Sequence, residues 1–310
     1  MRLIGRIELP AHKGPGGFDH AAVHGGVGRL FVAHTSNDAV DVVDCVNDRY
    51  LFSIPGLAGV AGTLVSEELG LIFTSNRGDD TVGIIREDDL NHVTKVKVGV
   101  RPNGLSVDAR RGLLLAANVG NPEIPGSHTL SVVDVQRLEL IHSIPVAGRT
   151  RWAIFDPSSD SFYVNIADPF EIAVVAGGNP TRVARSAAIP APGPHGLDLD
   201  PANGRLLCAC DEGKLFAVDA ESGSVLAQAE LSGAPDVIFL NASRRHLYVA
   251  VGDPGVMDVI DADTLRRLET VETAKGAHTL GFDARRNKLY VFEPGTHEAT
   301  IYGDEPAEEH

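Results

Sequence analysis

The chain has 310 residues, of which 43% are hydrophobic and 22% are charged, and its formal net charge is −15. A protein that neutralises phosphates needs a positive surface, so this charge argues against nucleic acid and an anionic membrane as partners. The 33 glycines and 18 prolines indicate many turns, which favours an all-β fold.

The N-terminal residues 1–10 have the pattern of a strand and lack the apolar core of an export signal. No apolar run approaches the roughly 18 residues of a membrane span. The three cysteines, Cys45, Cys208 and Cys210, are an odd number and do not resemble a disulfide framework. We therefore expect a cytoplasmic protein, the alternative being a chain from which a signal peptide was removed.

The sequence repeats seven times. If the first residue of each innermost strand is taken as the anchor of a repeat, the spacings are 42, 42, 48, 44, 41 and 42 residues. Periods of about 40–50 residues are typical of four-stranded propeller blades. The anchors are His20, Gly62, Gly104, Trp152, Gly196, Val237 and Thr279.

Each repeat contains the same predicted elements. A short first strand, as in 104–108, is followed by a tight turn and by a second strand, as in 114–118. A third strand, as in 129–134, and a fourth, as in 140–146, complete the unit. The last repeat has only three strands, and the opening residues 3–9 resemble a fourth strand. We therefore predict a single seven-bladed β-propeller over 1–303, closed by its N-terminal strand, with a solvated acidic tail at 304–310.

The repeat resembles the YVTN-type β-propeller family. The segments that carry this resemblance are VGVRPNGLSVDARRGLLLAAN at 98–118, AVDAESGSVL at 217–226 and HLYVAV at 246–251. The resemblance implies the fold and leaves the function open, since the family includes binding proteins and lactonase-like enzymes.

Two positions in every repeat are expected on one face of the ring, close to the axis. The first ring precedes each anchor and comprises Asp19, Ala61, Asn103, Arg151, His195, Asp236 and His278. The second ring lies fourteen residues after each anchor and comprises His34, Asn76, Asn118, Ile166, Cys210, Val251 and Glu293. Polar groups in both rings predict a site where the blades converge, although residues lining a water-filled channel are polar without any ligand.

Three imidazoles and three carboxylates in these rings could bind one divalent ion such as Zn, Mn or Mg, or act as general acid and base. The predicted metal ligands are His278, Glu293, Asp19 and His34. The predicted catalytic residues are His278 and His195. The predicted substrate-binding residues are Arg151, Trp152, Asn103, Asn118 and Asp236, because Arg and Asn side chains suit a carboxylate or a polarised carbonyl.

Among propeller enzymes, streptogramin lyase is similar in using His and Glu with a divalent metal on the channel face. That resemblance implies His278 as the base, Glu293 and Asp19 as metal ligands, and His195 as a supporting group. The residues before His278 are 275–277, Lys-Gly-Ala, which include no match for that enzyme's additional carboxylate. The antibiotic substrate is therefore not carried over.

Other polar residues have structural interpretations. Histidines outside the rings are expected at the surface or in packing, and Cys208 and Cys210 in the core, with Cys210 the one cysteine that could be a ligand. The histidines are His12, His24, His92, His142 and His246. Aspartates that end the first and third strands are expected to bind turn backbones. These are Asp44, Asp108, Asp134, Asp156, Asp200, Asp219, Asp261 and Asp283.

Three functional hypotheses remain open. In the first, the chain binds a small molecule at the channel, and a divalent metal is a further expectation. In the second, it is a metal-dependent lyase or lactone hydrolase that uses His278 and Glu293. In the third, it is a protein-interaction scaffold without catalysis. The loop 120–128 would be a lid in the first two cases and a rim insertion for a protein partner in the third. No nucleotide or quinone cofactor is expected, because the phosphate-binding loop and the periodic tryptophans are missing. A closed ring is expected to be a monomer.

Overall fold

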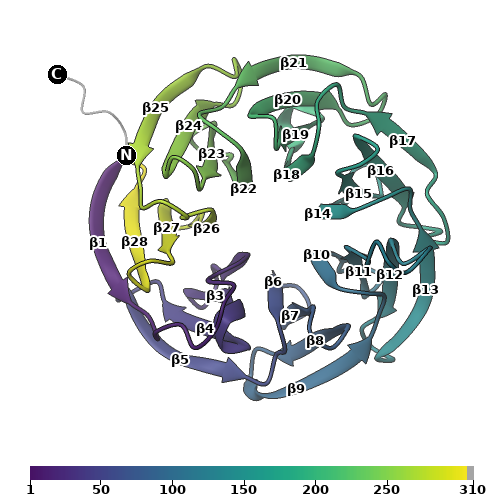
Figure 1. Cartoon of the computed structure of the whole chain (residues 1–310), viewed down its shortest axis with the longest axis horizontal. Helices are drawn as coiled ribbons and strands as arrows, with labels where there is room; N and C mark the ends of the chain where they lie inside the picture. Colours follow the sequence, from purple (N-terminus) through teal and green to yellow (C-terminus); the bar gives the residue numbers. More distant parts are fainter. Residues whose placement is uncertain (306–310) are drawn as a thin grey trace.

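The structure is a computed structural model that describes residues 1–305, and it is a seven-bladed β-propeller, as the repeat predicts. Seven four-stranded antiparallel sheets surround one axis, with each blade's first strand innermost (Figure 1). The helical elements of the described residues are two short 3-10 turns, η1 (Thr35–Asn37) and η2 (Pro201–Asn203).

The first three blades run in chain order from the axis outward. Blade 1 consists of β2 (Ala21–His24), β3 (Arg29–His34), β4 (Ala39–Asp44) and β5 (Arg49–Pro55). Blade 2 consists of β6 (Val60–Ser66), β7 (Leu71–Asn76), β8 (Thr81–Arg86) and β9 (Asp89–Lys97). Blade 3 consists of β10 (Pro102–Asp108), β11 (Leu113–Asn118), β12 (Thr129–Asp134) and β13 (Glu139–Pro145).

Blades 4 to 6 repeat this order. Blade 4 consists of β14 (Thr150–Asp156), β15 (Ser161–Ile166), β16 (Glu171–Ala176) and β17 (Arg185–Ala188). Blade 5 consists of β18 (Pro194–Asp200), β19 (Arg205–Cys210), β20 (Lys214–Asp219) and β21 (Val225–Glu230). Blade 6 consists of β22 (Pro235–Asn241), β23 (His246–Val251), β24 (Val256–Asp261) and β25 (Arg267–Glu272).

Blade 7 joins the two ends of the chain. It consists of β26 (Thr279–Asp283), β27 (Lys288–Glu293), β28 (Glu298–Gly303) and, outermost, β1 (Arg2–Glu8). The strands β1 and β28 are antiparallel, with Arg2 opposite Gly303 and Glu8 opposite Glu298 (Figure 1). Ile7 is buried in the core shared by blades 7 and 1. The predicted closure by the N-terminal strand is confirmed.

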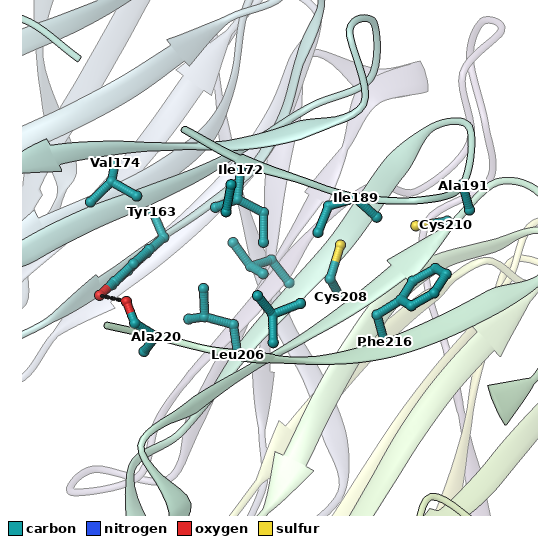
Figure 2. Close-up of a cluster of buried hydrophobic side chains, with 13 residues drawn as sticks. Tyr163, Ile172, Val174, Ile189, Ala191, Leu206, Cys208, Cys210, Phe216 and Ala220 are labelled. Carbon is teal, nitrogen blue, oxygen red and sulfur yellow. Dashed lines mark hydrogen bonds between the residues drawn. The ribbon is translucent and has the colours of Figure 1, made fainter. Parts of the chain in front are cut away.

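The core lies between the faces of adjacent blades. Figure 2 shows the cluster between blades 4 and 5, where the Tyr163 hydroxyl donates to the Ala220 carbonyl at 3.1 Å. Cys208 and Cys210 are free and fully buried in this cluster, so the core interpretation of both is confirmed. Because every blade is covered on both faces, its second strand is buried along its length, as the pattern of β11 shows.

The third-strand aspartates bind turn backbones as predicted. Asp44, for example, accepts the N–H groups of Val46 at 2.9 Å and Asn47 at 3.1 Å. Asp200, at the end of a first strand, binds the side chains of Asn203, Arg205 and Arg245 instead of the turn backbone.

The boundary of the predicted tail also differs from the structure. Asp304, expected in the solvated end, is buried and accepts hydrogen bonds from the Tyr248 hydroxyl and from His246 Nδ1, which lies 2.9 Å away. The propeller therefore includes Asp304, because blade 6 supplies donors for its carboxylate. The rest of the predicted tail, 306–310, lies outside the described residues.

Candidate functional site

A β-bulge in each of blades 2 to 6 aims the first ring at the mouth of the channel. In blade 3, Pro102 lies opposite Asn118 while Leu105 lies opposite Ala116, so two residues on β10 face one on β11. The extra residue re-aims the side chain at the bulge, and bulges have this effect next to many active sites. The same shift occurs at the first-ring positions of blades 2, 4, 5 and 6.

Glycine at the anchor allows the blades to approach each other at this level. A Cβ on Gly62 would lie 2.6 Å from the backbone carbonyl oxygen of Asn103, and a Cβ on Gly196 would lie 2.5 Å from the backbone carbonyl oxygen of Asp236. Each anchor glycine thus accommodates the backbone of the next blade's first-ring residue. The first ring is therefore a packed layer, in which the position of each residue depends on the two adjacent blades.

His195 is the centre of a charged cluster contributed by blades 4, 5 and 6. Its Nδ1 lies 2.6 Å from Asp211 Oδ1, and its Nε2 lies 3.1 Å from Asp236 Oδ1. The Arg151 guanidinium contacts Asp211 Oδ2 at 3.1 Å and His195 Nε2 at 3.2 Å. Four side chains from three blades therefore form one network at the mouth.

The electrostatics of this cluster favour an imidazolium between two carboxylates. Burial alone would lower the pKa of His195, but the charge of Asp236 and the hydrogen bond that His195 donates to Asp211 raise it to about 9. Burial would likewise raise the pKa of Asp236, and the positive charge of His195 instead lowers it. The pKa of Asp211 is also lowered, since His195 and Arg151 outweigh its burial.

A second group of side chains lies on the other half of the mouth. Arg77 donates to Asn103 Oδ1 at 2.5 Å and contacts Asp19 Oδ2 at 3.3 Å. Asp19 Oδ1 lies 3.3 Å from His20 Nε2. The pKa of His20 is lowered because its burial outweighs the charges of Asp19 and Asp236, so its imidazole is neutral at pH 7.

His278 completes the first ring beside Asp236. Its Nδ1 lies 2.8 Å from the Gly276 carbonyl oxygen, to which it donates, and its Nε2 is left for another partner. Its electrostatic interaction with Asp236 contributes to lowering the pKa of that carboxyl group. Six first-ring residues thus lie together at the mouth, where they contact one another or the shared partners Arg77 and Asp211. These residues are Asp19, Asn103, Arg151, His195, Asp236 and His278.

The second ring, which we expected to face the channel, lies inside the blades. His34 is fully buried and its Nδ1 lies 2.7 Å from the buried Asp41 carboxylate on the next strand. Its Nε2 contacts His12 Nδ1 at 2.8 Å. His34 therefore connects β3 to β4 and to the N-terminal segment through His12, and it makes no contact with the Asp19 carboxylate among the described residues.

Asn118 and Glu293 behave in the same way. Asn118 donates to Thr129 Oγ1 at 3.0 Å and Ser131 Oγ at 2.9 Å, and Glu293 accepts from Thr300 Oγ1 at 2.7 Å. Each side chain joins the second strand of its blade to the third. The predicted metal ligands His278, Glu293, Asp19 and His34 are consequently divided between the mouth and the blade interiors. In the described part of the chain, no group of three or more His, Cys, Asp or Glu residues is arranged to hold a metal ion.

Two residues of the mouth lie one position further along than the second ring; sequence reasoning missed Asp211 and noted Arg77 only as a neighbour of the rings. Arg77 and Asp211 each lie fifteen residues after their anchors, Gly62 and Gly196, and just beyond the second strand. A ring drawn at this position would have placed both at the mouth. The alternation of buried and exposed residues could not distinguish the two positions, because the second strands are buried on both faces.

Trp152 separates the mouth from the rest of the channel. It belongs to blade 4, but its ring lies 4.2 Å from that of His20 in blade 1 and 6.3 Å from that of Phe239 in blade 6. Beyond it lies a cavity of about 420 Å³, lined by the first strands of all seven blades. The predicted substrate-binding residue Trp152 therefore contacts both spaces.

A second cavity, of about 320 Å³, adjoins the mouth between blades 3 and 4. Arg101 and Arg149 line it, together with Asp168, His128 and part of the loop 120–128. The pKa of Arg149 is lowered by partial burial and by the charges of Arg151, Arg77 and Arg101. Four arginines therefore concentrate positive charge on this side of a strongly acidic protein.

The fold and the charged mouth define a propeller with a cluster of charged side chains at one end of its channel. Two curated relatives are the uncharacterized protein YncE of Salmonella typhimurium (strain LT2), 25% identical over 197 residues, and that of Salmonella typhi, 24% identical over 197 residues. Each alignment covers 62% of this chain and 54% of the relative, so the chain spans about half the length of the curated relatives it matches. No family model matches the chain.

Solved structures with the same fold are distant in sequence. A chain of Kuenenia stuttgartiensis hydrazine synthase has a TM-score of 0.81 at 14% identity and covers 96% of both chains. A chain from the mitotic checkpoint complex has a TM-score of 0.81 at 8% identity, covering 98% of this chain and 92% of that one. Both likenesses show the fold alone. Within residues 1–305, no helix is long and apolar enough to cross a membrane.

Proposed function

We propose that this propeller, which resembles YVTN-type repeat proteins, binds a small organic anion at the mouth of its channel, with Arg151 and Arg77 holding the anionic group. The observation that carries the proposal is that the buried Nε atoms of both guanidinium groups have no hydrogen-bond partner among residues 1–305. A buried N–H donor without a partner costs free energy that an anionic ligand would recover. Arginine also suits planar carboxylates, which it can bind through two parallel hydrogen bonds.

The surroundings of the mouth support an anion of more than a few atoms. Arg101 and Arg149 extend the positive charge into the adjoining 320 Å³ cavity. The loop 120–128 contributes Gly120, Pro122 and His128 to the lining. A ligand whose carboxylate or phosphate lies at Arg151 could therefore extend beneath this loop, which suits the predicted lid.

Asp211 and Asp19 do not prevent such binding. Each carboxylate is already paired, Asp211 with His195 and Arg151, and Asp19 with Arg77. The pairs hold the cationic side chains in place, and preorganised donors lose less entropy when a ligand binds.

Isothermal titration calorimetry with citrate, 2-oxoglutarate and inorganic phosphate tests this proposal. We expect at least one of these anions to bind wild-type protein and its affinity to fall about tenfold or more in Arg151→Gln, the change expected when a charge-assisted hydrogen bond is lost. Arg86→Gln is the matched control, since Arg86 pairs with Asp88 in an exposed hairpin of blade 2. Absence of binding by all three, or equal binding by the Arg151 variant, would overturn the proposal and favour the scaffold hypothesis.

The divalent metal and the catalytic roles of His278 and His195 stay predictions. Elemental analysis of untagged protein purified without chelating resin tests the metal. About one equivalent per chain, lost in His278→Ala, would support it and justify a screen of lyase and lactone substrates. A metal content unchanged by His278→Ala would contradict the predicted ligand set.

A further inference from the structure

The cavity beyond Trp152 contains an ionisable group that the mouth does not use. We propose that this lower channel is a second binding site, separate from the mouth, for a small organic cation with an apolar body. The group that would recognise the cation is the Asp198 carboxylate on β18, which contributes to the cavity lining.

Within the described part of the chain, Asp198 has hydrogen bonds but no cationic partner. Its Oδ1 accepts the Leu199 N–H at 2.8 Å, and its Oδ2 accepts the Leu240 N–H at 2.6 Å. The ion pairs found among residues 1–305 include Asp200 but not Asp198. Buried carboxylates are ordinarily paired, because taking an ionised group out of water is costly. An unpaired carboxylate on a cavity wall therefore favours a cationic ligand.

Asp200 provides an internal comparison two residues along the same strand. Arg205 and Arg245 contact its carboxylate, and these partners lower its pKa to about 2 although burial acts in the opposite direction. Burial raises the pKa of Asp198 to about 6, and its two backbone hydrogen bonds only partly oppose this. Asp198 is thus mostly ionised at pH 7 and lacks the counter-charge that Asp200 has.

The rest of the lining suits an apolar cation. Trp152, Phe155, Phe239 and Phe282 contribute aromatic rings, and valine and leucine side chains from the first strands fill the wall between them. Aromatic faces attract cations, most strongly when water is excluded. A volume of about 420 Å³ accommodates a compact ligand, and lies within the ordinary range for small-molecule pockets.

The approach to this site is from the end of the channel opposite the mouth. The Trp152–His20 contact lies at the level of the anchors, whereas Asp198, Phe239 and Phe282 lie two or three residues further along their strands. The net charge of −15 also favours the approach of cations. We therefore expect the ligand to be an amine with an aromatic or branched aliphatic body.

The experiment uses 2-phenylethylamine, its neutral analogue 2-phenylethanol and the anion 3-phenylpropionate. Trp152 is the only tryptophan of the chain and lines the cavity, so its emission reports on binding there, and calorimetry gives the affinity. We expect the amine to bind wild-type protein about tenfold or more tightly than the alcohol, and 3-phenylpropionate to bind least tightly. Asp198→Asn should remove this preference, and Phe282→Leu should weaken amine binding several-fold.

Arg151→Gln is the control that separates this site from the mouth, and it should leave the affinity for the amine within about twofold. Equal affinity of wild-type protein for the amine and the alcohol would overturn the proposal, as would undiminished amine binding by a folded Asp198→Asn. If Asp198→Asn does not fold, the comparison of the three probes on wild-type protein and on Phe282→Leu still decides the question. Failure of citrate to bind at the mouth would not affect this result.

Discussion

Trp152 and His20 contact each other across the channel, with ring centroids 4.2 Å apart, although they belong to blades 4 and 1. Trp152 also packs against the core between blades 6 and 7. One side chain therefore links four blades and separates the charged mouth from the apolar cavity. This contact has consequences for both stability and ligand access.

Replacement of Trp152 by alanine should destabilise the ring. We expect a loss of about 3 kcal/mol, because a large aromatic side chain is removed from a packed contact. Urea unfolding followed by circular dichroism measures this, since the variant has no tryptophan. Trp152→Phe, which retains an aromatic ring, should lose less than half as much. Equal stability of the alanine variant and wild-type protein would show that the contact does not join the blades.

Replacement of Gly196 by alanine should disturb the mouth. The added Cβ would lie 2.5 Å from the Asp236 carbonyl oxygen, so the backbones of blades 5 and 6 must separate. We expect a loss of about 2 kcal/mol or more, as in other overpacked sites. Gly5→Ala is the matched control, because nothing lies within 4 Å of its added Cβ. Thermal unfolding of the two variants should differ clearly, and equal melting temperatures would contradict the packed-layer description.

The His195 network should make stability depend on pH in the alkaline range. The folded-state pKa of about 9 exceeds the ordinary value of 6.5, so this stabilisation is fully present below pH 6.5 and is lost as the pH rises through 9. It amounts to about 3 kcal/mol at most. The lowered pKa values of Asp211 and Asp236 keep both carboxylates ionised throughout this range.

Unfolding by urea between pH 6 and pH 10 tests this expectation. The decrease in stability should be smaller in His195→Gln than in wild-type protein. His92→Gln, at an exposed position in blade 2, should follow the wild-type curve. Parallel curves for His195→Gln and wild-type protein would show that His195 is not held as an imidazolium.

Two isoleucines in β1 allow the ring closure to be tested without deleting the strand. Ile7 is 4% exposed and belongs to the core between blades 7 and 1, whereas Ile4 is 40% exposed. We expect Ile7→Ala to lose about 2–4 kcal/mol and Ile4→Ala less than about 1 kcal/mol. Chemical denaturation measures both. Similar losses for the two variants would contradict the pairing of β1 with β28 in solution.

The sequence alone predicts the fold, because each repeat can be recognised from the order of strand and turn residues within about 40 consecutive positions. The spacing of the anchors predicted the blades, and the missing fourth strand of the last repeat predicted that residues 3–9 close the ring, as β1 does. The bulged first-ring positions, Asn103, Arg151, His195 and Asp236 among them, could also be placed from the sequence, since each directly precedes an anchor.

Only the tertiary structure decided which other side chains reach the channel. The second strands are buried on both faces, so alternation does not show whether the residue fourteen or fifteen positions after the anchor faces the axis. Hydrogen bonds to the third strands hold His34 and Glu293 inside their blades, whereas Arg77 and Asp211 lie at the mouth. The distance between Trp152 and His20, and the lack of a cation beside Asp198, depend on contacts between distant repeats. Such contacts have no local period, because they are set by how the closed ring brings the blades together.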